Sequence, residues 1–309
     1  MPENRGMSLG VIVLCLIALG VVLFYSINQL SAETPPGTAP AMPARSANLH
    51  LAAENGDVAA IEAEIARGAP VDQLAVGMGA RHGMTPLMAA ASAGKVEAVR
   101  ALVKGGAAVN ARSPDGRTAL IFAAGWGDEA TVRALLDANA RFNDRTEDRW
   151  TALMMAAGRG KVESLKVLLD AGADVTAKNK WGQTPLMAAA RSGDEAKVRA
   201  LLTTGPAVNA ADNDGMTSLN LASGADGSIP AMQALIDAKA DINTADNEGV
   251  TPLMRAADKG DADKALLLLN AGAKAAVVDK SGRTAADWAK ARADSLGTAV
   301  AKLLEEAGK

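Results

Sequence analysis

The chain has 309 residues, a formal net charge of −3 and eight aromatic residues, whereas alanine occupies 68 positions. Aromatic side chains supply the largest buried areas in ordinary cores, so this interior has to be built from small, closely packed side chains, which disfavours a β-sandwich or barrel. The slight acidity gives no overall attraction to nucleic acid, whose binding domains are usually strongly basic. Cys15 is the only cysteine, which excludes an intramolecular disulfide and a cysteine-based zinc site.

The first predicted element is an apolar helix over residues 9–27. This stretch contains no charge, and as a helix it covers roughly 28 Å against a hydrocarbon core of about 30 Å. We expect a transmembrane signal-anchor, because secretory signal peptides have shorter apolar regions of about 7–15 residues. Arg5 precedes the segment and the next positive charge is Arg45, so residues 1–8 are expected in the cytoplasm and the rest on the periplasmic side. Cleavage near Ala32, leaving a secreted or periplasmic protein, is the alternative.

Residues 28–46 form the second predicted segment, a spacer. Pro35, Pro36, Pro40 and Pro43 lie there among small residues, a composition typical of extended linkers. We expect this segment to hold the following domain, residues 47–309, away from the membrane.

From residue 47 onwards the sequence repeats with a period of 33. Seven threonines open the repeated segments, at spacings of 33, 33, 33, 33, 34 and 33 residues. They are Thr85, Thr118, Thr151, Thr184, Thr217, Thr251 and Thr284. A threonine hydroxyl can cap a helix, and Pro86, Pro185 and Pro252 stand where a first helical turn tolerates proline. The pattern predicts a first helix after each threonine.

A glycine nine residues after the threonine is expected to end this first helix in a left-handed conformation. Such glycines are Gly94, Gly127, Gly160, Gly193 and Gly260. Apolar residues spaced three and four apart follow, as in Val162, Leu165, Leu168 and Leu169, and predict a second, amphipathic helix. Each unit is therefore predicted to be a helix, a turn, a helix and a projecting loop, and alanine is frequent because such units stack closely.

The period of 33 and the Thr-Pro-Leu pattern resemble the ankyrin repeat. The resemblance covers residues 47–309 and implies an all-α solenoid with polar capping units at both ends. Its eight units are placed near 47–79, 80–112, 113–145, 146–178, 179–211, 212–245, 246–278 and 279–309.

One position departs from the family pattern. The usual histidine falls at His50 in the first unit, but other residues replace it in six later units. They are Met88, Ile121, Met154, Met187, Asn220 and Met254. We therefore expect the hydrogen bond that this histidine makes to the adjoining loop to be absent in those units. The methionines are expected in the core, although an adaptable methionine row can also form a binding surface.

The resemblance also implies where a partner binds. In ankyrin repeats, partners usually contact the projecting loops and the exposed ends of the first helices, which line a concave groove. Matching positions in the third, fourth and fifth units are Arg112, Arg117, Trp126, Arg145, Trp150, Arg159, Lys178, Lys180, Trp181, Gln183 and Arg191. Tryptophan and arginine are frequent in interface hot spots, and the Arg/Lys rim predicts an acidic segment on the partner. The alternative is that the tryptophans fold onto neighbouring loops and the arginines pair with Asp115, Glu147 and Asp148.

Residues that could carry catalysis are few. The only histidines are His50 and His82. Loop-tip residues such as Asp212, Asp214, Asp246 and Glu248 stand where Asp makes turns, with weak cation binding as the alternative.

We therefore predict no catalytic residue, no metal, no cofactor and no nucleic-acid partner. The prediction is a non-enzymatic, monomeric protein-interaction domain tethered to a membrane through its N-terminal helix. A dedicated inhibitor or protective chaperone of one exported enzyme is the alternative function.

Overall fold

The computed structural model describes residues 44–76 and 82–308. Residues 1–43, 77–81 and 309 lie outside this described part, and with them the whole of the predicted membrane helix. Among the helices of the described residues, none is long and apolar enough to cross a membrane. The described residues belong to one compact unit.

Sixteen helices fill the described residues, in eight consecutive pairs, and these residues form no β-strand. The first helices are α2 (Ala44–Asn55), α4 (Pro86–Ser92), α6 (Ala119–Trp126), α8 (Ala152–Gly158), α10 (Pro185–Ser192), α12 (Ser218–Gly224), α14 (Pro252–Lys259) and α16 (Ala285–Ala291). The second helices are α3 (Val58–Ala66), α5 (Val96–Lys104), α7 (Glu129–Asp137), α9 (Val162–Asp170), α11 (Glu195–Leu202), α13 (Ile229–Asp237), α15 (Ala262–Asn270) and α17 (Ser295–Ala307). The predicted all-α repeat architecture is confirmed. Helix α2 includes residues 44–46, which the sequence pattern had placed in the spacer.

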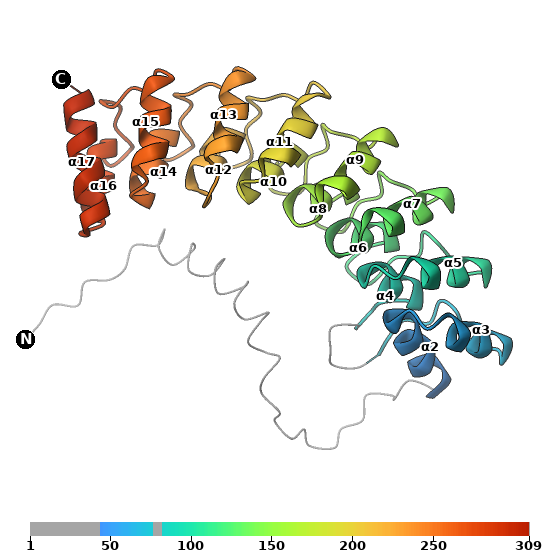
Figure 1. Ribbon diagram of the computed structural model, residues 1–309. Helices are drawn as coiled ribbons and strands as arrows, with labels where there is room; N and C mark the ends of the chain where they lie inside the picture. Colours follow the sequence, from blue (N-terminus) through green and yellow to red (C-terminus); the bar gives the residue numbers. More distant parts are fainter. Residues whose placement is uncertain (1–43, 77–81, 309) are drawn as a thin grey trace, which may run out of the picture. The chain divides into compact units, whose positions relative to one another are not determined.

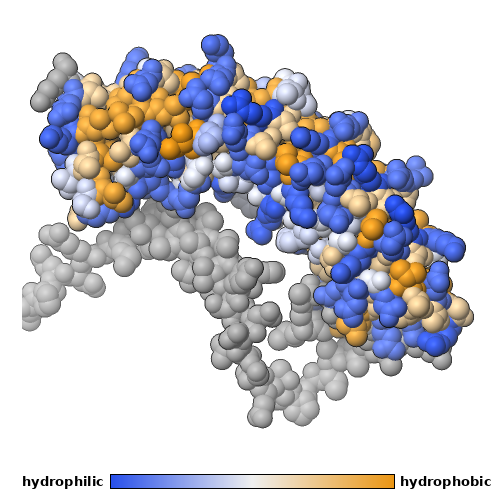
Figure 2. Space-filling view, viewed as in Figure 1, coloured by the Kyte–Doolittle hydropathy of each residue, from blue (hydrophilic) through white to orange (hydrophobic). Residues whose placement is uncertain are grey.

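The pairs stack side by side in chain order (Figure 1), with the first helices in one row and the second helices in another. The shared core lies between the rows and consists mainly of alanine and leucine. Figure 2 shows apolar residues gathered over the C-terminal repeats, around α13 to α15, on the face that it displays. Small core residues thus allow each helix pair to approach the next.

The predicted threonine caps are confirmed in all seven units. Each threonine side chain accepts a hydrogen bond from the backbone N–H three residues later. This bond satisfies one of the N–H groups that a helix leaves unpaired at its start. The first helices therefore begin where the sequence predicts.

The glycines that end the first helices serve two different purposes. Gly94, Gly193 and Gly260 are left-handed as predicted, with φ of 66°, 71° and 68°. The prediction is wrong at Gly127, where φ is −79°, and at Gly160, which is not left-handed either. A Cβ atom on Gly127 would lie 2.7 Å from the carbonyl oxygen of Ala91, and one on Gly160 would collide with that of Ala124. Here glycine permits close approach of the preceding repeat.

The position of the family histidine is filled in two ways. Met88, Met154, Met187 and Met254 are at most 1% exposed, so the expectation that they belong to the core is confirmed. His50 donates from Nε2 to the Met84 carbonyl, at 3.0 Å.

Asn220 corrects the expectation that this bond is absent elsewhere. Its Nδ2 donates to the carbonyl oxygens of Thr244, at 3.2 Å, and Val250, at 3.4 Å. The expectation is wrong at this residue because a primary amide also offers an N–H donor to the adjoining loop.

Candidate partner-binding groove

Backbone hydrogen bonds join the projecting loops to one another. In five consecutive loops, an N–H at one tip donates to a carbonyl of the preceding tip, at 2.8–3.0 Å. The donor and acceptor pairs are Glu147 and Asp115, Lys180 and Asp148, Asn213 and Trp181, Asn247 and Asp214, and Lys280 and Glu248. The tips form a continuous row, called the loop ledge below, which holds their side chains at regular intervals.

A polar side chain five residues before each threonine from Thr118 onwards closes the loop tip. These residues are Ser113, Thr146, Asn179, Asp212, Asp246 and Asp279. In each, a side-chain oxygen accepts the N–H four residues later, at 2.9–3.0 Å. Recurrence of a small oxygen-bearing residue at this position was the sequence signal for this role, and the turn-forming role of Asp212 and Asp246 is confirmed.

Trp126 stands at the centre of a cationic and aromatic group. It ends α6 and is 44% exposed. The guanidinium groups of Arg117 and Arg159 lie 5.7 and 5.9 Å from its ring centroid, and the Phe122 ring lies 5.9 Å away. Arg117 also lies 5.6 Å from the Phe122 ring. These four residues, the Trp126 cluster, bring together three sequence candidates and Phe122, which the sequence analysis missed.

Trp181 is the second exposed tryptophan, at 43%. The Nζ of Lys180 lies 5.3 Å from its ring centroid and 2.7 Å from a carboxylate oxygen of Asp148 on the preceding loop. Both distances are compatible with attraction, a cation–π contact and an ion pair. Trp181 is therefore presented to solvent on the loop ledge.

Trp150 differs from the other two candidate tryptophans. It is only partly exposed and packs against the hydrophobic core. Its backbone N–H donates to the Thr146 hydroxyl, at 3.0 Å. Trp150 therefore packs against the core, a placement that neither the groove expectation nor the neighbouring-loop alternative describes, whereas Trp126 and Trp181 are exposed.

Several cationic candidates bind neighbouring loops. The Arg112 guanidinium donates to the carbonyl of Arg145, and the Lys178 ammonium donates to that of Ala211, at 3.1 Å. Each bond joins residues 33 positions apart, so these side chains clamp one loop to the next. Carbonyl acceptors leave the positive charges uncompensated.

The remaining candidates have other partners. Arg145 lies 3.6 Å from a carboxylate oxygen of Asp174, and Arg117 lies 3.0 Å from one of Asp115. Gln183 accepts a bond from Asn179, at 3.3 Å.

Arg191 adjoins the acidic part of the ledge. The pKa of Arg191 lies below its ordinary value, chiefly because burial disfavours the charged form; Asp212 and Asp214 raise the pKa and Arg255 lowers it.

In the last repeat, Asp279 pairs with basic and aromatic side chains of the same repeat. The Asp279 carboxylate accepts from the Arg283 guanidinium, at 2.9 and 3.0 Å, and from the Trp288 indole, at 2.9 Å. Burial raises the pKa of Asp279, but hydrogen bonds from Arg283, Trp288 and Ser281 lower it by a larger amount. The net pKa therefore lies below its ordinary value. This carboxylate is charged and fully partnered.

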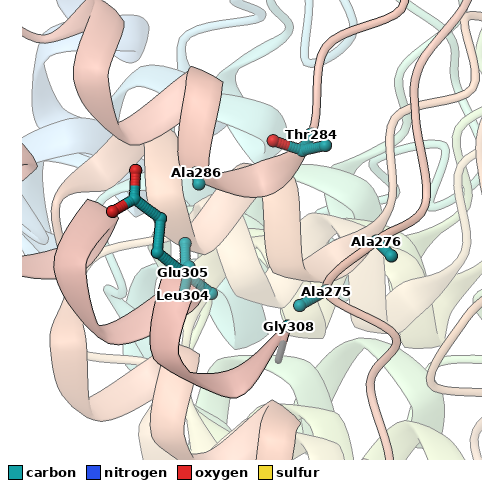
Figure 3. Close-up of a pocket in the computed structure, with 7 residues that line it drawn as sticks. All are labelled: Ala275, Ala276, Thr284, Ala286, Leu304, Glu305 and Gly308. Atoms are coloured by element: carbon teal, nitrogen blue, oxygen red, sulfur yellow. The ribbon is translucent and has the colours of Figure 1, made fainter.

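A cavity of about 370 Å³ lies at the C-terminal end, among the last loop and α17 (Figure 3). Its lining residues are Ala275, Ala276, Thr284, Ala286, Leu304, Glu305 and Gly308. Thr284 caps α16 and bonds Asp287, and Glu305 pairs with Lys290. In the described part of the chain, no group of three or more His, Cys, Asp or Glu residues could hold a metal ion.

Comparison with known proteins agrees with the geometry. A family model described as ankyrin repeats (3 copies) matches residues 49–146, 109–179, 153–246 and 221–308. No curated protein sequence matches the chain closely enough to serve as a relative. The family matches extend from the first helix pair to the last and cover most of the chain, which therefore belongs to the ankyrin-repeat family.

Proposed function

We propose that this protein is a non-enzymatic, monomeric interaction module that binds an acidic segment of a partner protein at the Trp126 cluster. Ankyrin repeats generally bind proteins, and the family is typically non-enzymatic. The observation that carries the proposal is an indole that is 44% exposed and flanked by two guanidinium groups. Such an anchor buries a large apolar area and offers charge to a carboxylate at the same point.

The loop ledge extends this surface. Trp181 is 43% exposed beside Lys180, and the charges of Arg112 and Lys178 are not neutralised by their carbonyl acceptors. Uncompensated positive charge raises the rate at which an acidic segment is captured and orients it on the surface. The partner segment is therefore expected to contact several repeats in succession.

A double substitution, Trp126→Ala with Arg159→Ala, tests the site. Partners are crosslinked in cells expressing the full chain, recovered from an envelope extract and quantified. Loss of two hot-spot side chains predicts at least about tenfold weaker recovery. Leu266→Ala is the control, because Leu266 is also exposed, at 40%, but lies on the second helix α15. Equal recovery by the double variant and the control contradicts the assignment.

The same experiment separates an interaction scaffold from a dedicated inhibitor. Several crosslinked proteins support a scaffold. One exported enzyme, bound one to one and inactive in the complex, supports an inhibitor or protective chaperone.

We also propose that the repeats are exported and held at a membrane by residues 9–27. Support comes from the 19 consecutive uncharged residues and from Arg5 on their N-terminal side. Protease added to cells with a permeabilised outer layer is expected to digest the repeats and to spare residues 1–8. If the repeats are protected from the protease, the orientation is the opposite of the one proposed. If a soluble chain that starts after Ala32 is recovered, the N-terminal segment is a cleaved signal peptide.

A further inference from the structure

On the loop ledge, one of the two carboxylate oxygens of Asp212 has no hydrogen-bond partner. Oδ1 of Asp212 accepts the N–H groups of Asp214, at 3.0 Å, and Met216, at 2.9 Å. Oδ2 is buried and has no hydrogen-bond partner, and Asp212 as a whole is 8% exposed. A buried charged oxygen without a donor destabilises a fold, so this atom calls for a physical reason.

The corresponding atom is partnered in the two following repeats. Oδ2 of Asp246 accepts from the Arg255 guanidinium, and Oδ2 of Asp279 accepts from Arg283 and Trp288. The donors stand either just before the repeat threonine or four residues after it. These two positions therefore supply the side chain that completes the carboxylate.

The sixth repeat has an apolar residue at both positions. They are Met216, just before Thr217, and Leu221, four residues after it. In the fifth repeat, by contrast, Nδ2 of Asn179 donates to Oε1 of Gln183, at 3.3 Å. Repeat six thus keeps the acceptor and lacks the donor.

The surroundings suit a basic side chain from outside. Because Oδ2 is itself buried, a basic head group reaches it only when the covering side chains shift. Met216 and Leu221 are partly exposed, a thioether adapts readily to a neighbour, and the stem of lysine or arginine packs along apolar surface. Asp214 is exposed on the same loop tip and adds negative charge. Arg191 of the preceding repeat is attracted electrostatically by Asp212 and Asp214 but makes no hydrogen bond to Oδ2 of Asp212.

We propose that Asp212, Met216 and Leu221 form a docking slot for one lysine or arginine side chain of the partner segment. The slot rests on the proposed function, since it adds a second anchor to the same groove. Arg159 follows α8 and the slot adjoins α12, two helix steps further along the row (Figure 1). Steps of about 8–10 Å give roughly 16–20 Å, which an extended chain covers in about five or six residues. The partner segment therefore carries an acidic residue and, about five or six residues away, a basic one.

The first test measures stability. The double variant Asp212→Asn with Met216→Gln copies the Asn179–Gln183 pair of the fifth repeat: it keeps the acceptor Oδ1, gives the new Nδ2 an acceptor and removes the buried carboxylate. We expect the Tm to rise by about 2–4 °C. The matched control Asp246→Asn loses a charged partner, Arg255, and its Tm falls. A fall in Tm for the double variant Asp212→Asn with Met216→Gln overturns the slot, because it shows that the native carboxylate is already compensated.

The second test measures specificity. Random peptides displayed on phage are selected on the purified full chain. The wild type is expected to enrich peptides with the acidic and basic residues at the stated spacing. Asp212→Asn and Leu221→Arg, which supplies an internal donor like Arg255, are expected to lose the basic residue and keep the acidic one. A selected peptide should bind Asp212→Asn at least about tenfold more weakly than wild type.

The controls distinguish this slot from the proposed function. Asp263→Asn, an exposed acid on α15, should leave the basic enrichment unchanged. Acidic enrichment without basic enrichment overturns the slot alone, and basic enrichment without acidic enrichment overturns the proposed function alone. Failure to select any peptide contradicts both.

Discussion

Repeats three to five and repeats six to eight build the same loop tip from different residues. The earlier repeats use the neutral side chains Ser113, Thr146 and Asn179, and the later ones use Asp212, Asp246 and Asp279. All six accept the same backbone N–H, at 2.9–3.0 Å. The backbone requires an oxygen acceptor and does not require a charge. The change from neutral to acidic along the ledge is therefore free to serve recognition.

The aromatic residues show the same contrast. Trp288 in the last repeat donates its indole N–H to Asp279, at 2.9 Å, and lies under the Arg283 guanidinium, at 4.2 Å. Trp126 has two guanidinium groups at 5.7 and 5.9 Å from its ring centroid and remains 44% exposed. The last repeat uses its arginine and tryptophan to complete a carboxylate, whereas in the third repeat Arg117 pairs with Asp115 and the Trp126 indole stays exposed to a partner.

The largest expected effect comes from the scaffold that both regions share. Leu120 and Leu253 occupy the same position, two residues after the threonine, and each is 1% exposed. Leu120→Ala and Leu253→Ala should each lower the free energy of unfolding by about 2–5 kcal/mol, because each leaves a cavity. Urea unfolding followed by circular dichroism measures both. If only one of the two substitutions causes a large loss of stability, the two regions do not share an equivalent scaffold.

The loop acceptors should separate the regions. Asp279→Ala removes bonds to two backbone N–H groups, a guanidinium and an indole, and should lower the free energy of unfolding by about 3 kcal/mol. Ser113→Ala removes a neutral acceptor and should lower it by about 1 kcal/mol. Equal losses indicate that charge adds nothing to the acidic tips.

Acid should weaken the acidic region selectively. The pKa of Asp279 is lowered in the folded state, so its stabilising contribution is fully present above the ordinary value of about 4. It is lost as the pH falls through the lowered folded value. The stability difference between wild type and Asp279→Asn, measured by urea unfolding, should therefore be present at neutral pH and shrink below about pH 4. A difference that persists unchanged in stronger acid contradicts this linkage.

The smallest expected effect on stability is at the proposed anchor. Trp126→Ala should change the free energy of unfolding by no more than about 0.5 kcal/mol, because the side chain is exposed. Trp150→Ala should destabilise more, because Trp150 packs against the core. Urea unfolding measures both variants. A larger stability loss for Trp126→Ala than for Trp150→Ala shows that Trp126 has a structural role and weakens its assignment to binding.

Much of the architecture follows from local sequence. The threonine caps, Pro86 at the start of α4 and the left-handed Gly94, Gly193 and Gly260 all appear as predicted. Each of these features depends on bonds among residues only a few positions apart. The period then determines that such units stack, since one helix pair cannot bury its apolar faces alone.

The sequence by itself determined the repeat, its helices and the change from neutral to acidic loop-tip residues along the chain. The tertiary structure decided which side chains are available: Trp126 is exposed and Trp150 is packed, and Arg159 meets Trp126 from 33 residues away. It also decided that Gly127 permits close approach rather than a left-handed turn, and that Oδ2 of Asp212 lacks a donor. The physical reason is that these properties depend on neighbouring side chains brought together when repeats stack, which the period alone does not specify.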